Sequence, residues 1–113
     1  MARERTDKQI LSERDALLAS LQEQMDAQGL NYAHYRRMAQ DYADLYVIKE
    51  KLKRDIDVRG AMVEYQHGGG QSGWKRNDAV QEIPKILKSM DGILMSLGVR
   101  PNQLNLRDDG VEI

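Results

Sequence analysis

Apolar residues recur at helical spacing through the first quarter of the chain, with polar residues between them. The stripe consists of Ile10, Leu11, Leu17, Leu18, Leu21 and Met25. Thr6 and Gln9 have the spacing of a capping box, in which each side chain binds a free backbone N–H of the other residue. Gly29 can end the helix, because glycine adopts the left-handed cap conformation without a Cβ clash. The pattern predicts a helix over about residues 7–28.

A second and longer apolar stripe follows, and Asn31 is placed to cap its helix. The a and d positions of a heptad are occupied by Tyr35, Met38, Tyr42, Leu45, Leu52 and Ile56. Lys49 interrupts this pattern, and the helix is expected over residues 32–59, before Gly60. At about 1.5 Å per residue it is about 40 Å long, so one short helix cannot cover its apolar side.

The pattern changes after Ala61. Residues 62–65 favour a short extended segment, and residues 67–73 are rich in glycine. Residues 74–76 then bring the chain back. This region is either a glycine-rich loop or a small hairpin.

A third amphipathic helix is predicted over residues 78–97, capped by Asn77. Its apolar face comprises Val80, Ile83, Ile86, Leu87, Met90, Ile93, Leu94 and Leu97. Pro84 lies inside this segment, where proline removes a backbone donor and clashes with the preceding turn. We therefore expect a kink at Pro84 or a helix that begins near Ile83.

Together these patterns predict an all-α fold: a helical bundle or hairpin with one long helix, a glycine-rich loop or small hairpin, and a third amphipathic helix, assembling as a homo-oligomer. Residues 1–101 are expected to form one domain, closed by Gly98 and Pro101. Residues 102–113 are acidic, have no periodicity and are expected to be a tail.

Charge and composition limit the functions open to this chain. The 17 Lys and Arg residues nearly balance the 18 Asp and Glu residues, so contact with DNA would require a local basic patch. Cysteine is absent, which excludes disulfides and thiolate metal sites and fits a reducing cytosol. No apolar run approaches the roughly 20 residues that span a bilayer, so no membrane partner is expected.

Catalytic and metal-binding motifs are not found in the sequence. His34 and His67 lack ligand spacing, and Asp55 and Asp57 point in different directions on a helix. The glycine run lacks the Gly-Lys-Ser/Thr ending of a phosphate loop. We expect no catalytic residue, no metal and no cofactor.

Basic residues are the best functional candidates. The residues expected to face DNA are Lys53, Arg54, Arg59, Lys75, Arg76 and Lys85. The alternative is a set of ordinary surface ion pairs between residues four apart, namely Glu50 with Arg54, Lys51 with Asp55, and Lys53 with Asp57. Lys75 and Arg76 are less neutralised, because only Asp78 is close in sequence.

Tyrosines of the long helix can either stack on bases or pack in an apolar interface. Their helical spacing favours packing for Tyr32, Tyr35, Tyr42 and Tyr46. The residues expected at the subunit interface are Tyr35, Met38, Tyr42, Leu45, Leu52, Ile86, Met90 and Leu94.

The order of segments from Tyr32 to Pro101 resembles the small subunit of tailed-phage terminases. The similarity rests on a long helix that ends in residues 51–60, an extended segment, a glycine turn, Trp74 to Asn77, and a last helix that closes on residues 96–101. This resemblance implies a ring-like homo-oligomer that binds double-stranded viral DNA in the host-cell cytoplasm. It also implies a separate large subunit, with ATPase and nuclease activity, that the ring recruits or regulates during genome packaging.

Two points stay open at this stage. No helix-turn-helix is evident in the first 30 residues, so the resemblance does not transfer a DNA-binding surface. The alternative, which the heptad-like stripes motivate, is a helical scaffold or adaptor that binds only protein. The acidic tail suits a tether for the large subunit.

Overall fold

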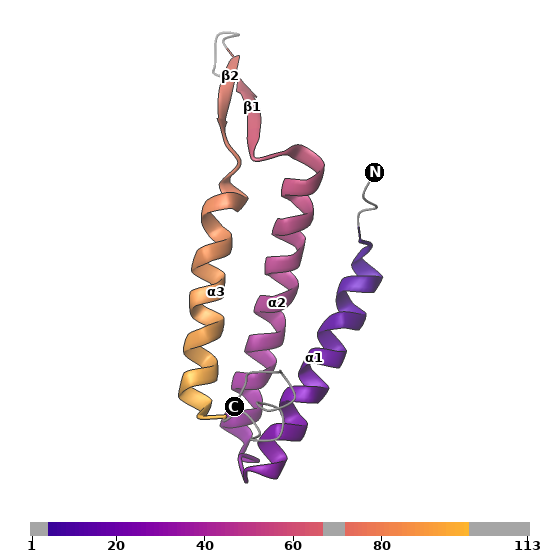
Figure 1. Cartoon of the computed structure of the whole chain (residues 1–113), viewed down its shortest axis with the longest axis vertical. Helices are drawn as coiled ribbons and strands as arrows, with labels where there is room; N and C mark the ends of the chain where they lie inside the picture. The colour runs from indigo at the N-terminus through magenta and orange to yellow at the C-terminus, as the bar shows by residue number, and fades with distance from the viewer. Residues whose placement is uncertain (1–4, 67–71, 100–113) are drawn as a thin grey trace, which may run out of the picture.

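The computed structural model describes residues 5–66 and 72–99, which form three helices and a two-stranded sheet. In chain order the elements are α1 (Asp7–Ala27), α2 (Ala33–Arg59), β1 (Met62–Gln66), β2 (Ser72–Arg76) and α3 (Asp78–Leu97). Figure 1 shows α2 between α1 and α3 and antiparallel to both, with the hairpin beyond the ends of α2 and α3. The fold is mostly helical, as predicted, with a small two-stranded sheet between α2 and α3 in the chain.

Local sequence signals explain both ends of α1. The predicted capping box is present: the Gln9 N–H donates to the Thr6 hydroxyl (3.1 Å), and the Thr6 N–H donates to the Gln9 side-chain oxygen (2.8 Å). Gly29 follows α1 with φ at +77°, as expected for a residue after a helix. The prediction that Asn31 caps α2 was wrong. The N-cap is Tyr32, whose side chain makes no capping hydrogen bond.

The beginning of α3 is set by its cap. The Asn77 side-chain oxygen accepts a hydrogen bond from the Ala79 N–H at 3.0 Å, as predicted. The alternative of a helix starting near Ile83 was wrong, because Pro84 lies within a helix that begins at Asp78. The predicted kink at Pro84 stays a prediction. Gly98 ends α3 in the left-handed conformation, with φ at +70°.

All three helices contribute to one apolar cluster near the end of the bundle that contains Gly29 and Gly98. Its buried members are Leu21 and Met25 from α1, Ala39 from α2, and Leu97 from α3. The partly buried residues packed against them are Leu18, Leu30, Tyr35, Met38, Tyr42, Ile93, Leu94 and Val99. This cluster joins α1 and α3 to the same stretch of α2.

The small hairpin, one of the two predicted alternatives, is confirmed. β1 pairs with β2 in antiparallel register, with Met62 opposite Arg76 and Glu64 opposite Trp74. The glycine-rich tip, His67 and the acidic tail 102–113 lie outside the described residues. The hairpin projects from the helices at the end opposite the apolar cluster (Figure 1).

Candidate nucleic-acid interface

Asn77 fixes the base of the hairpin to the end of α2. Its side chain is buried, and its Nδ2 donates to the Asp55 carboxylate (2.8 Å) and to the Gly60 carbonyl (3.0 Å). The Asn77 backbone N–H donates to the Ala61 carbonyl at 2.7 Å. These bonds, together with the capping bond to Ala79, use every polar atom of the Asn77 side chain. One residue thus joins α2, the hairpin and α3.

A cluster of charged side chains connects the start of α1 to α2 near the same end. Glu50 is only 3% exposed, and its carboxylate pairs with Arg5. Arg5 also pairs with Glu13, which accepts a hydrogen bond from the Tyr46 hydroxyl (3.1 Å). The hydrogen bond from Arg5 lowers the pKa of Glu13. A buried carboxylate requires such partners, since an unpaired charge in the interior is strongly unfavourable.

Arg54, a predicted DNA contact, is held by α1. Its guanidinium lies 2.7 Å from the Asp7 carboxylate and donates to the Arg5 carbonyl at 3.1 Å. Hydrogen bonding and charge attraction from Arg54 lower the pKa of Asp7. Arg54 would have to exchange these partners in order to reach a phosphate.

Lys53 lies beside the buried Glu50. Its Nζ is 3.6 Å from the Glu50 carboxylate, while about half of its side chain is exposed. A hollow of about 320 Å³ next to this pair is lined by Arg5, Glu50, Lys53, Arg54 and Asp57. Burial lowers the pKa of the neighbouring Lys49, and repulsion from Lys53 and Arg5 adds to this effect. The side chains that line the hollow carry both signs of charge.

Arg59 closes α2 and pairs with Asp55 at 3.3 Å. The hydrogen bond from Asn77 is the main cause that lowers the pKa of Asp55, and Arg59 adds to it. About half of the Arg59 side chain stays exposed. An exposed pair of this kind is weak, so Arg59 can exchange its partner at low energetic cost.

The remaining predicted cations are on the hairpin and α3. Lys75 is 3.8 Å from Asp78, and Lys85 is 3.3 Å from Glu82. Arg76 is exposed and has no ion pair with any residue in the described ranges. Arg76 is therefore the predicted contact whose charge is least compensated.

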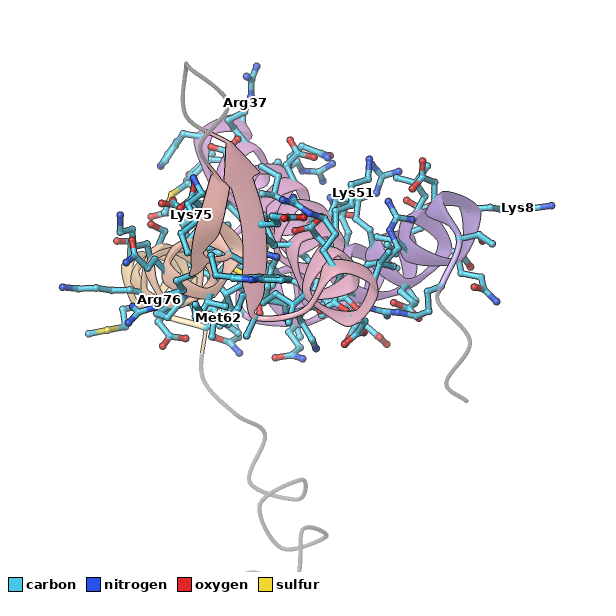
Figure 2. All side chains as sticks on the ribbon, turned by 90° about the horizontal axis from the view of Figure 1, so that it is seen from above. Lys8, Arg37, Lys51, Met62, Lys75 and Arg76 are labelled. Atoms are coloured by element: carbon cyan, nitrogen blue, oxygen red, sulfur yellow. The ribbon has the colours of Figure 1, made fainter. Side chains whose placement is uncertain are left out.

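The predicted basic residues gather at one end of the molecule, with Lys85 further along α3. None of the three pairs expected within α2 forms among the described residues. Lys8 was not among the basic residues considered from the sequence, and Lys51 was considered only as part of the basic group at the end of the long helix. Both are exposed and have no ion pair within the described chain. Figure 2, viewed from this end, shows Lys75 and Arg76 at the hairpin, Lys51 over α2, and Lys8 on the outer side of α1.

The residues predicted for a subunit interface are buried or half-buried by contacts within a single chain. Met90 is buried, and Tyr35, Met38, Tyr42 and Leu94 pack against the apolar cluster. Leu45, Leu52 and Ile86 are half-buried. Among the described residues, the large apolar side chains that stay exposed are Leu11, Tyr32, Ile48, Val58, Met62, Trp74, Leu87 and Met95.

Three of the four tyrosines considered make contacts within the chain, as the packing interpretation predicted. Tyr35 and Tyr42 contact the apolar cluster, and burial raises the pKa of Tyr42. Tyr46 is half-buried and donates to Glu13. Tyr32 is exposed instead and stacks on His34, with ring centroids 6.2 Å apart.

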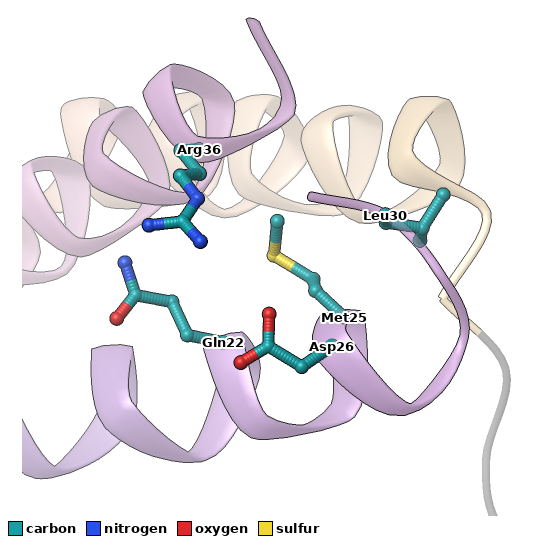
Figure 3. A pocket seen from close by; sticks show the side chains of 5 residues that line it. All are labelled: Gln22, Met25, Asp26, Leu30 and Arg36. Carbon is teal, nitrogen blue, oxygen red and sulfur yellow. The ribbon is translucent and has the colours of Figure 1, made fainter. Parts of the chain in front are cut away.

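A second pocket lies where α1 ends and α2 begins. Figure 3 shows Gln22, Met25, Asp26, Leu30 and Arg36 around it, and its volume is about 50 Å³. This space suits one or a few water molecules rather than a substrate. Within the described ranges, no group of His, Cys, Asp or Glu residues is arranged to hold a metal ion. None of the described helices is long and apolar enough to cross a membrane.

Comparison with known proteins yields one match. A sequence model of the family described as "Phage terminase, small subunit" matches residues 17–104, which is most of the chain. The match begins within α1, so Arg5, Asp7 and Glu13 of the charged cluster lie before it. Among curated proteins and among solved structures, no significant match was found.

Proposed function

The chain belongs to the phage terminase small-subunit family, which serves phage DNA packaging, and we propose that it recognises double-stranded viral DNA as a ring-like homo-oligomer. In this role it recruits or regulates the large ATPase and nuclease subunit in the cytoplasm of the host cell. Members of the family are generally non-catalytic subunits. The observation that carries the DNA-binding proposal is the gathering of exposed cations around the hairpin and the end of α2.

The DNA-facing residues fall into two groups in this proposal. Four exposed cations are weakly paired or unpaired and can reach phosphates directly: Arg59, Arg76, Lys53 and Lys85. Lys75, which the sequence also predicted to face DNA, pairs with Asp78 and is not placed in this group. Arg54 contributes only after it leaves Asp7. The net charge of −1 is consistent with a local contact and not with a uniformly basic surface.

Assembly would use apolar side chains that the single chain leaves exposed. Met95 is 81% exposed on α3, and Leu87 is exposed on the same helix. Ile48 and Val58 are exposed on α2. The half-buried Leu45, Leu52 and Ile86 of the predicted interface can extend such a contact, whereas the buried Met90 would mainly support it from inside.

The proposal is tested by two measurements on the purified full chain. Native mass spectrometry is expected to show one closed assembly of many copies, and a duplex is expected to bind with an affinity that falls steeply as salt increases. A monomer, dimer or trimer without affinity for DNA at low salt would contradict the proposal. That result would favour a helical adaptor that binds only protein.

A further inference from the structure

The register of the hairpin separates its side chains onto two faces with different chemistry. Residues directly opposite each other in an antiparallel pair project to the same face, and neighbours along a strand project to opposite faces. Met62 and Arg76 therefore share a face with Glu64 and Trp74. Val63 and Lys75 belong to the other face.

One of these faces is turned toward the rest of the molecule. Val63 is buried, and Lys75 beside it reaches Asp78 at the start of α3. The face formed by Met62, Glu64, Trp74 and Arg76, here called the outer hairpin face, is open. Trp74 is 67% exposed and Met62 is 52% exposed. In Figure 2, Met62 and Arg76 lie beside each other, and Lys75 lies apart from them.

Hydrogen bonds attach the hairpin, and with it the outer hairpin face, to the end of α2. Asn77 directly follows Arg76, and its hydrogen bonds to Asp55, Gly60 and Ala61 tie the end of β2 to the end of α2. An isolated two-stranded hairpin is only marginally stable in water, so this attachment matters for its shape. Arg76 and Trp74 therefore project from a fixed position.

We propose that duplex DNA lies across the outer hairpin face, with Arg76 on a phosphate and the Trp74 ring against the adjacent sugar and base edges. This inference rests on the proposed function, and it names the surface and the residues that bind. A two-stranded ribbon fits a DNA groove, and a cation beside an exposed ring provides both attraction and contact area. Arg76 has no competing ion pair in the described ranges.

The proposal divides two neighbouring cations that sequence alone treats as equivalent. Arg76 contributes strongly to binding. Lys75, which faces away and pairs with Asp78, contributes little. Glu64 opposes binding, because its carboxylate lies across from Trp74 on the same face. Removing the charge of Arg76 is therefore expected to weaken binding, removing that of Lys75 to change it little, and removing that of Glu64 to strengthen it.

The test uses the single tryptophan of the chain as the reporter. The full-length protein is titrated with a short duplex while Trp74 fluorescence and DNA anisotropy are followed over a range of salt concentrations. We expect the emission of Trp74 to change on binding and to recover at high salt. R76A is expected to weaken binding several-fold and to reduce the slope of log K against log salt by about 1.

K75A is the matched control, since it removes one positive charge from the adjacent position. We expect it to change affinity less than twofold, on the order of a surface substitution away from the contact. E64Q is expected to strengthen binding. Circular dichroism of each variant checks that the helices are retained.

Four outcomes would overturn the inference. If DNA binds without any change in Trp74 emission, or if R76A and K75A weaken binding equally, the duplex lies elsewhere and the proposed function still stands. If the parent chain binds no duplex even at low salt, the proposed function fails as well. If Trp74 emission depends on protein concentration in the absence of DNA, and duplex does not alter it further, the face contacts a second copy instead.

Discussion

At the end of the bundle that contains Gly29 and Gly98, α1 meets α2 through Leu21, Met25 and Ala39, whereas near the hairpin it meets α2 largely through charged side chains. Ile10 is buried in this second region, but Arg5, Asp7 and Glu13 make the polar contacts around it. The same pair of helices is thus held in two physically different ways. Apolar burial is insensitive to charge screening, while exposed ion pairs weaken as salt rises.

The largest effect is expected from truncating the apolar end. M25A should lower the free energy of unfolding by about 2–5 kcal/mol, because it leaves a cavity where all three helices meet. M62A is the comparison at a methionine that is exposed and lies outside this cluster, and it should change this free energy much less. Urea unfolding followed by circular dichroism measures both. Equal losses in the two variants would show that the apolar cluster is not the main support of this end.

A smaller loss is expected at the junction of α2, the hairpin and α3. N77A removes the helix cap and the donor to the Gly60 carbonyl, and it leaves Arg59 as the remaining donor to the Asp55 carboxylate. We expect a loss of about 2–3 kcal/mol in the free energy of unfolding. N77D is a useful comparison, because it keeps the cap acceptor but places a second carboxylate beside Asp55. Stability equal to the parent in N77A would contradict the role assigned to this side chain.

The weakest and most condition-dependent effect is expected at the charged end. The pKa values of Asp7 and Glu13 are lowered in the folded state, so their contribution is present above their unfolded pKa values of about 4 and is lost as pH falls through the folded values. Amide hydrogen exchange is expected to show that the first turns of α1 lose protection below about pH 4, before the last turns. Added salt should weaken the same turns at neutral pH.

D7N and R54Q supply the control for this experiment. Each removes one partner of the pair between α1 and α2, so each should reduce both the pH dependence and the salt dependence of exchange in the first turns. Uniform protection along α1 at low pH, in the parent and in the variants alike, would mean that the charged contacts do not hold this part of the helix.

Signals confined to neighbouring residues predicted much of the fold. The Thr6–Gln9 capping box and the Asn77 cap are both present, because each acts over three residues or fewer. Asn31 failed as a cap because α2 begins after Tyr32, whose side chain makes no capping bond. The hairpin could only be offered as one of two alternatives, since its strands are short and pair with nothing else in the described chain.

The candidate site was harder to predict, because two of its central ion pairs join residues that are far apart in the sequence. Spacing within α2 predicted a pair between Glu50 and Arg54. In the structure Arg54 pairs with Asp7, at the start of α1, and Glu50 pairs with Arg5, just before α1. The burial of Glu50 had no signal in the sequence, because it follows Lys49 at the point where the heptad is interrupted. Which cation faces outward depends on strand register, which placed Arg76 and Lys75 on opposite faces.

The arrangement of α2 between α1 and α3 also has a kinetic consequence. Each helix packs against the helix nearest to it in the sequence, α1 against α2 and α2 against α3, and the two strands of the hairpin are neighbours as well (Figure 1). Such local connections give a low contact order, for which folding is typically fast. The chain is therefore expected to fold quickly by itself, and in the proposed ring the association of copies, rather than their folding, would limit the rate of assembly.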